Sequence, residues 1–265
     1  LAGSVKTHFR GRGIDFEEVR NYQPGDDIRS IDWRVTARTG EAHTKLYREE
    51  RERPVLIFVD QRRSMAFGSQ CCFKSVQAAE VASLLAWAAL NNNDRIGGLV
   101  FNNERHSIIR PARNKTAVLH LLNTLNEYNH ALGDPAEPTT SSTKETVAQP
   151  SSIDQAVVEL RRIAKPGTAI FLISDFADLS HESIKQLHQL KRHNDINAIR
   201  ISDPMEQQLP INAGKYYTNG SKRLRFDANN KSAAKAFAQR FIARSSALSD
   251  RLASHGIPII DIKTN

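Results

Sequence analysis

The chain alternates buried strand patterns with amphipathic helical stretches over most of its length. The clearest strand covers residues 55–59, five apolar side chains in a row that end at Asp60, as in a strand buried on both faces. Similar strands are predicted at residues 96–101, 169–174, 196–201 and 257–262, with a shorter antiparallel edge strand at 106–109. Helical stripes are predicted at residues 73–90, 115–128, 156–163, 181–191 and 231–253. This alternation predicts an α/β fold with a mainly parallel sheet flanked by helices.

Residues 1–52 follow a different pattern and carry little apolar periodicity. Ile31 and Trp33 alternate as in a strand, with Trp33 as an anchor in the core, and residues 44–47 are predicted to form a second short strand. Such a segment cannot bury enough surface to fold alone. We therefore expect an irregular N-terminal cap segment that packs on a larger domain formed by residues 53–265.

Two segments of the larger domain depart from the strand and helix alternation. Residues 131–150 are rich in Pro, Thr, Ser, Gly and Glu, which predicts a mobile polar loop. Residues 214–227 contain two short β-type runs on either side of Asn219-Gly220, which predicts a hairpin with a type I′ turn.

The basic residues are concentrated near the C-terminus. The formal net charge is +8, and residues 211–265 hold ten Lys/Arg against three Asp/Glu, whereas residues 1–53 hold eleven against ten. This local excess predicts a solvated basic surface, with nucleic acid or an acidic protein surface as the alternative partner. No apolar run approaches the ~20 residues that cross a bilayer. Cys71 and Cys72 are adjacent, which favours a cytoplasmic protein with reduced thiols.

Carboxylates follow two of the predicted strands, Asp60 and Asp175. The carboxyl ends of parallel strands share one edge of a sheet, so both side chains should converge there. Ser64 lies four residues beyond Asp60, and Ser151, with Ser152 as a close competitor, begins the helix that precedes the Asp175 strand. Because hard oxygen donors suit Mg²⁺, the sequence predicts a metal-type site formed by Asp60, Ser64, Ser151 and Asp175.

This constellation resembles the metal-ion-dependent adhesion site of von Willebrand factor A domains, which have a Rossmann-type fold. That site uses Asp-x-Ser-x-Ser after the first strand, a Thr at a helix start and an Asp after the fourth strand. The resemblance matches Asp60, Ser64, Ser151 and Asp175 to these positions, but Arg62 replaces the middle Ser. A guanidinium about 4 Å from a divalent ion costs several kcal/mol at an effective dielectric of about 20. We therefore expect weak or no Mg²⁺ binding, with Arg62 near the two carboxylates in place of the ion.

The N-terminal segment resembles one particular family more specifically. Its sequence is FEEVRNYQPGDDIRSIDW at residues 16–33, followed by TAR at 36–38 and YREERE at 47–52. This run is similar to the signature of the bacterial domain-of-unknown-function family 58 (DUF58), whose proteins join such a cap to a von Willebrand factor A-like domain. The resemblance implies association with MoxR-type AAA+ ATPases in chaperone-like or complex-maturation roles, and it implies no established enzymatic activity.

The charged residues of the cap predict a network of ion pairs that fixes its shape. Three aspartates lie within reach of several arginines, whose planar groups can bind carboxylates bidentately. The expected pairs join Asp26, Asp27 and Asp32 to Arg20, Arg29, Arg34 and Arg38.

The leading hypothesis is a non-enzymatic protein-interaction module, an adaptor of a MoxR-type AAA+ ATPase. Its contact face would be formed by residues 60–67, 102–105, 151 and 175–178, and the expected partner-binding residues are Arg62, Phe67, Asn102 and Asp178. One alternative is a metal-dependent hydrolase that uses Asp60 and Asp175, although no convincing nucleophile or general base accompanies them. The other is nucleic-acid binding through the basic C-terminal segment.

Overall fold

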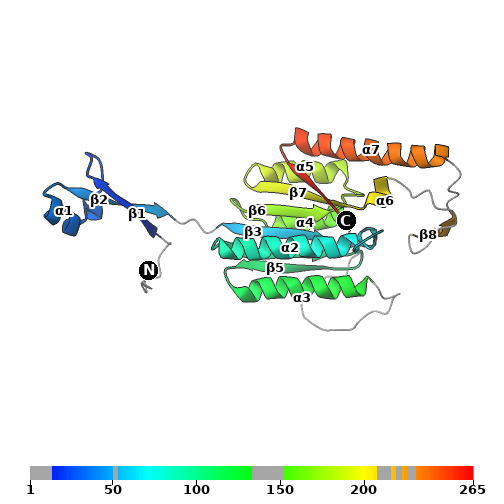
Figure 1. Cartoon of the computed structure of the whole chain (residues 1–265), viewed down its shortest axis with the longest axis horizontal. Helices are drawn as coiled ribbons and strands as arrows, with labels where there is room; N and C mark the ends of the chain where they lie inside the picture. The colour runs from blue at the N-terminus through cyan, green and yellow to red at the C-terminus, as the bar shows by residue number, and fades with distance from the viewer. Residues whose placement is uncertain are drawn as a thin grey trace. The chain divides into compact units, whose positions relative to one another are not determined.

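The computed structural model describes residues 14–49, 53–132, 152–207, 216–218, 223–225 and 231–264. The chain divides into two compact units, residues 1–52 and 53–265 (Figure 1). Among the described residues, no helix has both the length and the apolar character needed to cross a membrane.

The first unit has regular structure and is not the irregular segment that the sequence predicted. Strands β1 (Ile14–Asn21) and β2 (His43–Glu49) pair antiparallel, with a register shift between Phe16 and Glu18. The 3-10 helix η1 (Ile28–Ser30) and the helix α1 (Trp33–Thr39) connect the two strands.

Trp33 is not the strand residue or core anchor that the sequence predicted. Asp32 accepts hydrogen bonds from the backbone N–H groups of Arg34 and Val35, so it is the N-cap of α1 and Trp33 is the first helical residue. The Trp33 side chain is 68% exposed.

The expected ion-pair network of the first unit forms only in part. Arg20 binds Asp26 at 2.8 Å. Asp27 instead accepts from the backbone N–H of Arg29, where it caps η1, and Asp32 lies 3.4 Å from Lys45. Two of the three aspartates therefore act mainly as helix caps, because their short side chains reach nearby backbone donors more easily than a distant guanidinium.

The second unit contains a six-stranded sheet in the order β10-β7-β6-β3-β4-β5. Its strands are β3 (Pro54–Asp60), β4 (Arg95–Phe101), β5 (His106–Ala112), β6 (Ala169–Ser174), β7 (Asp195–Ser202) and β10 (Ile259–Lys263). Neighbouring strands are parallel except for β5, which is an antiparallel edge strand. The predicted α/β class, with its mainly parallel sheet, is confirmed.

Helices cover both faces of this sheet (Figure 1). Side chains of α2 (Lys74–Asn91) and α3 (Lys115–Ala131) pack on one face, with Val55, Ile57 and Val59 of β3. Leu56 and Phe58 point to the other face, against α4 (Ile153–Ile163), α5 (His181–Lys191) and α7 (Lys231–Ser254). Burial of alternate residues on opposite faces explains the unbroken apolar run of β3.

The carboxyl ends of β3 and β6 meet at the point where the chain changes its direction of winding. Strands β4 and β5 extend the sheet on one side of β3, while β6, β7 and β10 extend it on the other. Ligands of open α/β sheets bind at such a switch point. The short helices η2 (Arg63–Met65) and α6 (Pro204–Gln207) follow β3 and β7 directly, so both begin at this edge.

Two smaller predictions fall largely outside the described residues. The predicted mobile loop at 131–150 includes only the end of α3 from the described part of the chain. The hairpin strands β8 (Tyr216–Thr218) and β9 (Arg223–Arg225) do pair antiparallel, but the predicted Asn219-Gly220 turn lies among residues that are not described.

Candidate functional site

Asp60 and Arg62 form a buried ion pair at the carboxyl end of β3. The Arg62 guanidinium donates from Nε to Asp60 Oδ1 at 3.0 Å and from Nη2 to Oδ2 at 2.7 Å. The backbone N–H of Arg62 also donates to Oδ1, and the Ser174 hydroxyl donates to Oδ2 at 2.6 Å. Asp60 is completely buried and Arg62 is only 5% exposed. The pair is therefore bidentate and almost sealed from water.

A second cation, Lys74, occupies the same edge of the sheet. Its ammonium lies 2.9 Å from Oδ2 of Asp175 and 2.7 Å from Oε1 of Glu206. The other Asp175 oxygen accepts from the backbone N–H of Ala177 and lies 3.8 Å from Arg62 Nη2. Lys74 and Asp175 are both largely buried, so these contacts link the two ion pairs into one array. We call Asp60, Arg62, Lys74, Asp175 and Glu206 the charge cluster.

The cluster shifts the proton affinities of its members in different directions. Complete burial raises the pKa of Asp60, an effect that hydrogen bonds from Arg62 and Ser174 oppose. Burial also acts to raise the pKa of Asp175, but the Lys74 ammonium outweighs it and holds that pKa below its ordinary value. Burial disfavours the charged form of Lys74, yet Asp175 and Glu206 raise its pKa. Lys74 and Asp175 are therefore a mutually stabilised ion pair at neutral pH.

Asp203 is a further buried carboxylate at this edge, directly after β7. Its Oδ2 accepts from the Ser69 backbone N–H at 2.8 Å and from the Thr264 hydroxyl at 2.5 Å, and its Oδ1 accepts from the Met205 N–H. Burial opposes ionisation, but the hydrogen bonds from Ser69 and Thr264 lower the pKa of Asp203. This carboxylate thus fixes the loop that leads into α2 and presents Lys74.

Phe176 has a strained backbone beside the cluster. Its φ angle is +53°, in the left-handed region that bulky residues rarely adopt. Its N–H donates at 2.9 Å to the same Ser174 hydroxyl that donates to Asp60. A single hydroxyl therefore connects the buried ion pair to the conformation of the segment after Asp175. Strain of this kind persists only where surrounding contacts hold it in place.

The side chains at this edge do not fit a divalent cation. Both Asp60 oxygens accept from Arg62, and the two Asp175 oxygens accept from Lys74 and Ala177. Among the described side chains, no group of three or more His, Cys, Asp or Glu residues is placed to hold a metal. Two cations from the chain itself occupy the positions at which an ion would neutralise the carboxylates.

The two predicted serine ligands have different outcomes. The Ser64 hydroxyl is buried at this edge and has no hydrogen-bond partner among the described residues. Ser151 lies outside the described residues, and its competitor Ser152 is the N-cap of α4. The Ser152 hydroxyl accepts from the Gln155 backbone N–H, and the Gln155 side chain accepts from the Ser152 N–H. This reciprocal pair is a capping box, so the Ser152 hydroxyl is already engaged.

Replacing Arg62 with serine is expected to create measurable binding of Mg²⁺ and Mn²⁺. The change removes the guanidinium from both oxygens of Asp60, adds a hydroxyl at position 62 and retains the buried hydroxyl of Ser64 two residues later. Isothermal titration of both ions into the native protein and into Arg62→Ser is the measurement. Because Lys74 still neutralises Asp175, binding should be stronger when Lys74→Met is added. Tight binding by the native protein, or none by the double variant, would contradict this expectation.

The predicted partner-binding residues differ widely in accessibility. Arg62 and Asn102 are buried, and the Asn102 side chain accepts from the N–H groups of Glu104 and Arg105, so both offer little surface to a partner. Phe67 is half-buried. The Asp178 side chain is 76% exposed and lies 3.8 Å from Arg62 Nη1, so it alone of the four is well placed to meet a partner.

The sequence interpretation missed Lys74 and Glu206. Each lies in the first turn of a helix, α2 or α6, that begins at the carboxyl edge of the sheet. In an α/β unit such helix starts surround the strand ends that carry the ligand-binding loops. A charged residue in the first turn of a helix after a strand is the signal that could have identified both.

Two bacterial proteins are similar to this chain in sequence. An uncharacterized protein of Mycobacterium tuberculosis is 29% identical over 201 residues, which cover 76% of this chain and 58% of that protein. The uncharacterized protein YeaD of Bacillus subtilis is 28% identical over 160 residues, 60% of this chain and 37% of that protein. The chain thus spans less than two thirds of the length of these relatives.

Solved structures match this chain at lower sequence identity. The conserved hypothetical protein BatB of Bacteroides thetaiotaomicron is 15% identical, with a TM-score of 0.44 over 77% of this chain and 98% of that one. A von Willebrand factor type A protein of Catenulispora acidiphila is 11% identical, with a TM-score of 0.39 over 60% of this chain and 35% of that one. The family described as "Protein of unknown function DUF58" matches residues 18–246, so the chain belongs to the DUF58 family.

Proposed function

We propose that this chain is a protein-interaction module that acts as an adaptor of a MoxR-type AAA+ ATPase in the assembly or maturation of a client protein. The observation that carries the proposal is the charge cluster at the switch point of the sheet. Its buried carboxylates are bound by Arg62 and Lys74. They therefore stabilise the surrounding loops and are not available to react with a substrate. Loops held in this way present a defined surface to a partner.

The exposed charges beside the cluster supply the contact surface. Arg63, at the start of η2, and Asp178, in the loop after β6, are both exposed and lie close in sequence to cluster residues, Arg62 and Asp175 respectively. The Arg63 backbone N–H donates to the Asn103 side chain at 2.8 Å, which ties the loop after β3 to the loop after β4. Charged side chains on anchored loops favour electrostatic recognition of another protein.

The hydrolase alternative receives less support from the same geometry. A general base or a nucleophilic carboxylate must reach a substrate atom directly or through one water. Asp60 is sealed behind Arg62, and both oxygens of Asp175 already accept hydrogen bonds. Neither carboxylate is positioned as a free base.

Reversing the charge of Arg63 is expected to disrupt partner binding. The native chain and Arg63→Glu, carrying an affinity tag, are used to capture proteins from a native bacterial lysate, and captured proteins are quantified by mass spectrometry. We expect a MoxR-type AAA+ ATPase to be enriched by the native chain and at least fivefold less by Arg63→Glu.

Arg161→Glu is the matched control for this capture. Arg161 is also an exposed arginine, but it lies near the end of α4, where the chain approaches the opposite edge of the sheet before β6. The control should capture the ATPase as the native chain does. The adaptor role fails if the native chain enriches no AAA+ ATPase, and the contact surface is wrong if both variants behave alike.

A further inference from the structure

A cavity of about 410 Å³ lies beside the charge cluster, between α7 and the ends of β6 and β7. Its volume falls within the range of ligand-binding pockets. Three arginines of α7 and three phenylalanines line it: Arg240, Arg244, Arg251, Phe176, Phe237 and Phe241. We call this cavity the arginine groove.

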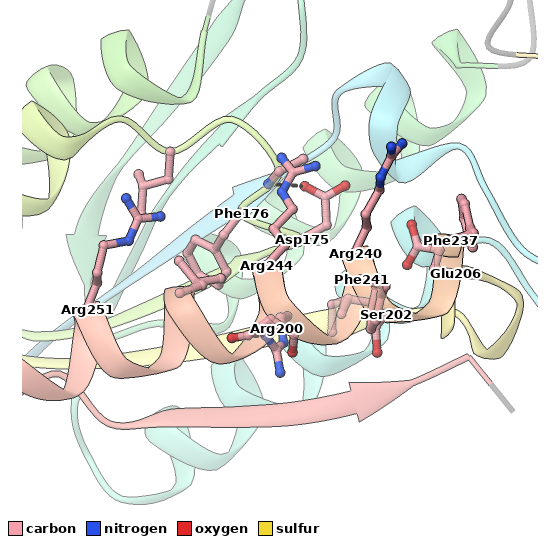
Figure 2. Close-up of a pocket in the computed structure, with 15 residues that line it drawn as sticks. Asp175, Phe176, Arg200, Ser202, Glu206, Phe237, Arg240, Phe241, Arg244 and Arg251 are labelled. Carbon is pink, nitrogen blue, oxygen red and sulfur yellow. Dashed lines mark hydrogen bonds between the residues drawn. The ribbon is translucent and has the colours of Figure 1, made fainter. Parts of the chain in front are cut away.

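The three arginines form a row along one side of α7. They are four and seven residues apart, spacings that place side chains on the same face of a helix. Figure 2 shows Arg240 and Arg244 projecting from α7 toward the side of the cavity where Asp175 lies. At about 1.5 Å per residue the row extends about 16 Å, which matches about five residues of an extended peptide at about 3.3 Å each.

These arginines are not neutralised by the acids around them. Asp175 and Glu206 line the groove but bind Lys74, and the fourth lining arginine, Arg200, binds Asp261 bidentately. Arg244 has only a loose contact, 3.8 Å, with the exposed Asp178. Among the described side chains, no acid lies within ion-pair distance of Arg240 or Arg251. Within the described part of the chain, the charges of Arg240 and Arg251 are therefore uncompensated.

The floor of the groove is apolar. Phe176 is only 4% exposed and is held in place by its hydrogen bond to Ser174, while Phe237 is 40% exposed at the open side. Phe241, Leu179 and Leu248 complete the apolar lining. An occupant that complements the groove thus carries negative groups along one side and an apolar side chain on the other.

We propose that the arginine groove binds a short acidic peptide segment of a partner protein, with Asp or Glu side chains on the three arginines and a Leu or Phe side chain on the phenylalanine floor. Arginine binds carboxylates with two parallel hydrogen bonds, which gives both affinity and orientation. The proposal rests on the proposed function in taking the occupant to be a protein, and it adds the chemistry of the recognised segment.

Single-stranded nucleic acid fits the groove less well. Its bases bind to aromatic rings that offer an open face for stacking. Phe176 is buried and Phe241 is only partly exposed, so Phe237 is the one ring of the three with a substantially open surface. A buried apolar floor suits an aliphatic or aromatic side chain of a peptide better than a row of stacked bases.

Fluorescence anisotropy with a defined probe tests the proposal. The probe is the labelled peptide Glu-Asp-Leu-Phe-Glu-Asp-Leu-Glu, and the controls are the same peptide with Gln and Asn for its acids, or with Ser for Leu and Phe. We expect saturable binding of the probe by the full chain and at least tenfold weaker binding of either control peptide. A labelled single-stranded oligonucleotide of eight nucleotides is titrated in parallel.

Two variants within the groove locate the site, and a control of the same charge as the first lies on α4. Arg240→Glu combined with Arg244→Glu should weaken probe binding at least tenfold, and Phe237→Ser should weaken it severalfold. The matched control, Arg161→Glu with Arg162→Glu on α4, should bind as the native chain does. Circular dichroism and thermal unfolding verify that each variant is folded.

Each outcome bears on the groove separately from the adaptor role. The groove proposal is overturned if the probe does not bind, if the α4 control loses binding equally, or if the oligonucleotide binds more tightly and is lost in the Arg240 and Arg244 variant. If the native chain captures the ATPase but does not bind the probe, the adaptor role stands and the groove has no part in it.

Discussion

Replacing Asp60 with alanine should destabilise the second unit by about 3–5 kcal/mol, the usual cost of leaving one member of a buried ion pair without its partner. Arg62 then keeps its charge in a position that is almost closed to water. The Ser174 hydroxyl loses its acceptor as well. Urea unfolding followed by circular dichroism measures the free energy of unfolding, and an unchanged slope against urea concentration shows that the comparison is valid.

The double variant Asp60→Leu with Arg62→Met separates lost charge pairing from lost packing. Apolar residues of similar volume often replace a buried ion pair at no net cost. We therefore expect the double variant to recover most of the stability that Asp60→Ala loses. Asp178→Ala removes an exposed acid of the same region and should change stability very little. A loss of less than 1 kcal/mol in Asp60→Ala would show that the buried pair is not an important source of stability.

Replacing Lys74 with methionine should reverse the pH dependence of stability that Asp175 contributes. In the native chain Lys74 holds the pKa of Asp175 below its ordinary value, so the stabilisation is present above about pH 4 and is lost as the pH falls further. The variant retains the burial of Asp175 but removes its nearest cation, so its folded pKa should rise above the unfolded value. The variant should then gain stability as the pH falls through that raised pKa.

Unfolding free energies of the native chain and of Lys74→Met between pH 3.5 and 8 test this sign change. At pH 7 we expect a loss of about 3 kcal/mol in the variant, because Asp175 and Glu206 lose their shared cation. The difference between the two proteins should shrink toward acid pH. Lys191→Met alters a half-buried lysine at the end of α5, outside the charge cluster, and should produce parallel curves. A difference that is constant with pH would mean that Asp175 is not the group that Lys74 stabilises.

The sequence predicts the sheet of this protein well because its central strands are buried on both faces. The run in β3 is apolar up to Asp60, and the run in β6 is apolar up to Ser174, which Asp175 follows directly. Such runs have one stable solution, a central position in a sheet that helices cover on both sides. Because β3 and β6 are parallel neighbours, the residues that follow them lie at the same edge of the sheet, and this alone places the two carboxylates together.

The side chains that bind those carboxylates are harder to predict, because a lysine or arginine that is distant in the sequence can reach them. Lys74 follows Asp60 by fourteen residues and precedes Asp175 by a hundred and one, so local spacing carries no sign of the contact. Arg62 was easier to interpret, because its two-residue separation from Asp60 keeps its guanidinium near the strand end in almost any rotamer.

The errors in the first unit have a local cause. Ile31 and Trp33 alternate with polar residues, a pattern that fits a strand, but Asp32 between them is a strong N-cap. The cap determines the outcome, since it satisfies two backbone donors at the start of α1. The choice between Ser151 and Ser152 also depends on a local capping signal. Gln155 lies three residues after Ser152, and this capping-box spacing identifies Ser152 as the helix cap.

The Ser174 hydroxyl has a consequence for how this sequence can vary over evolution. It donates to Asp60 and accepts from the backbone N–H of Phe176, the residue with the strained φ angle. One oxygen therefore forms hydrogen bonds with a buried carboxylate and with a buried backbone group. Alanine fits the space but removes one hydrogen bond from Asp60 and leaves the Phe176 N–H without its acceptor, whereas threonine keeps both hydrogen bonds. Substitution at position 174 is therefore tied to positions 60 and 176, and relatives that keep the carboxylate and a bulky residue there should keep a hydroxyl between them. Where glycine replaces the residue at 176, the backbone strain disappears, and substitutions at position 174 should be tolerated more often.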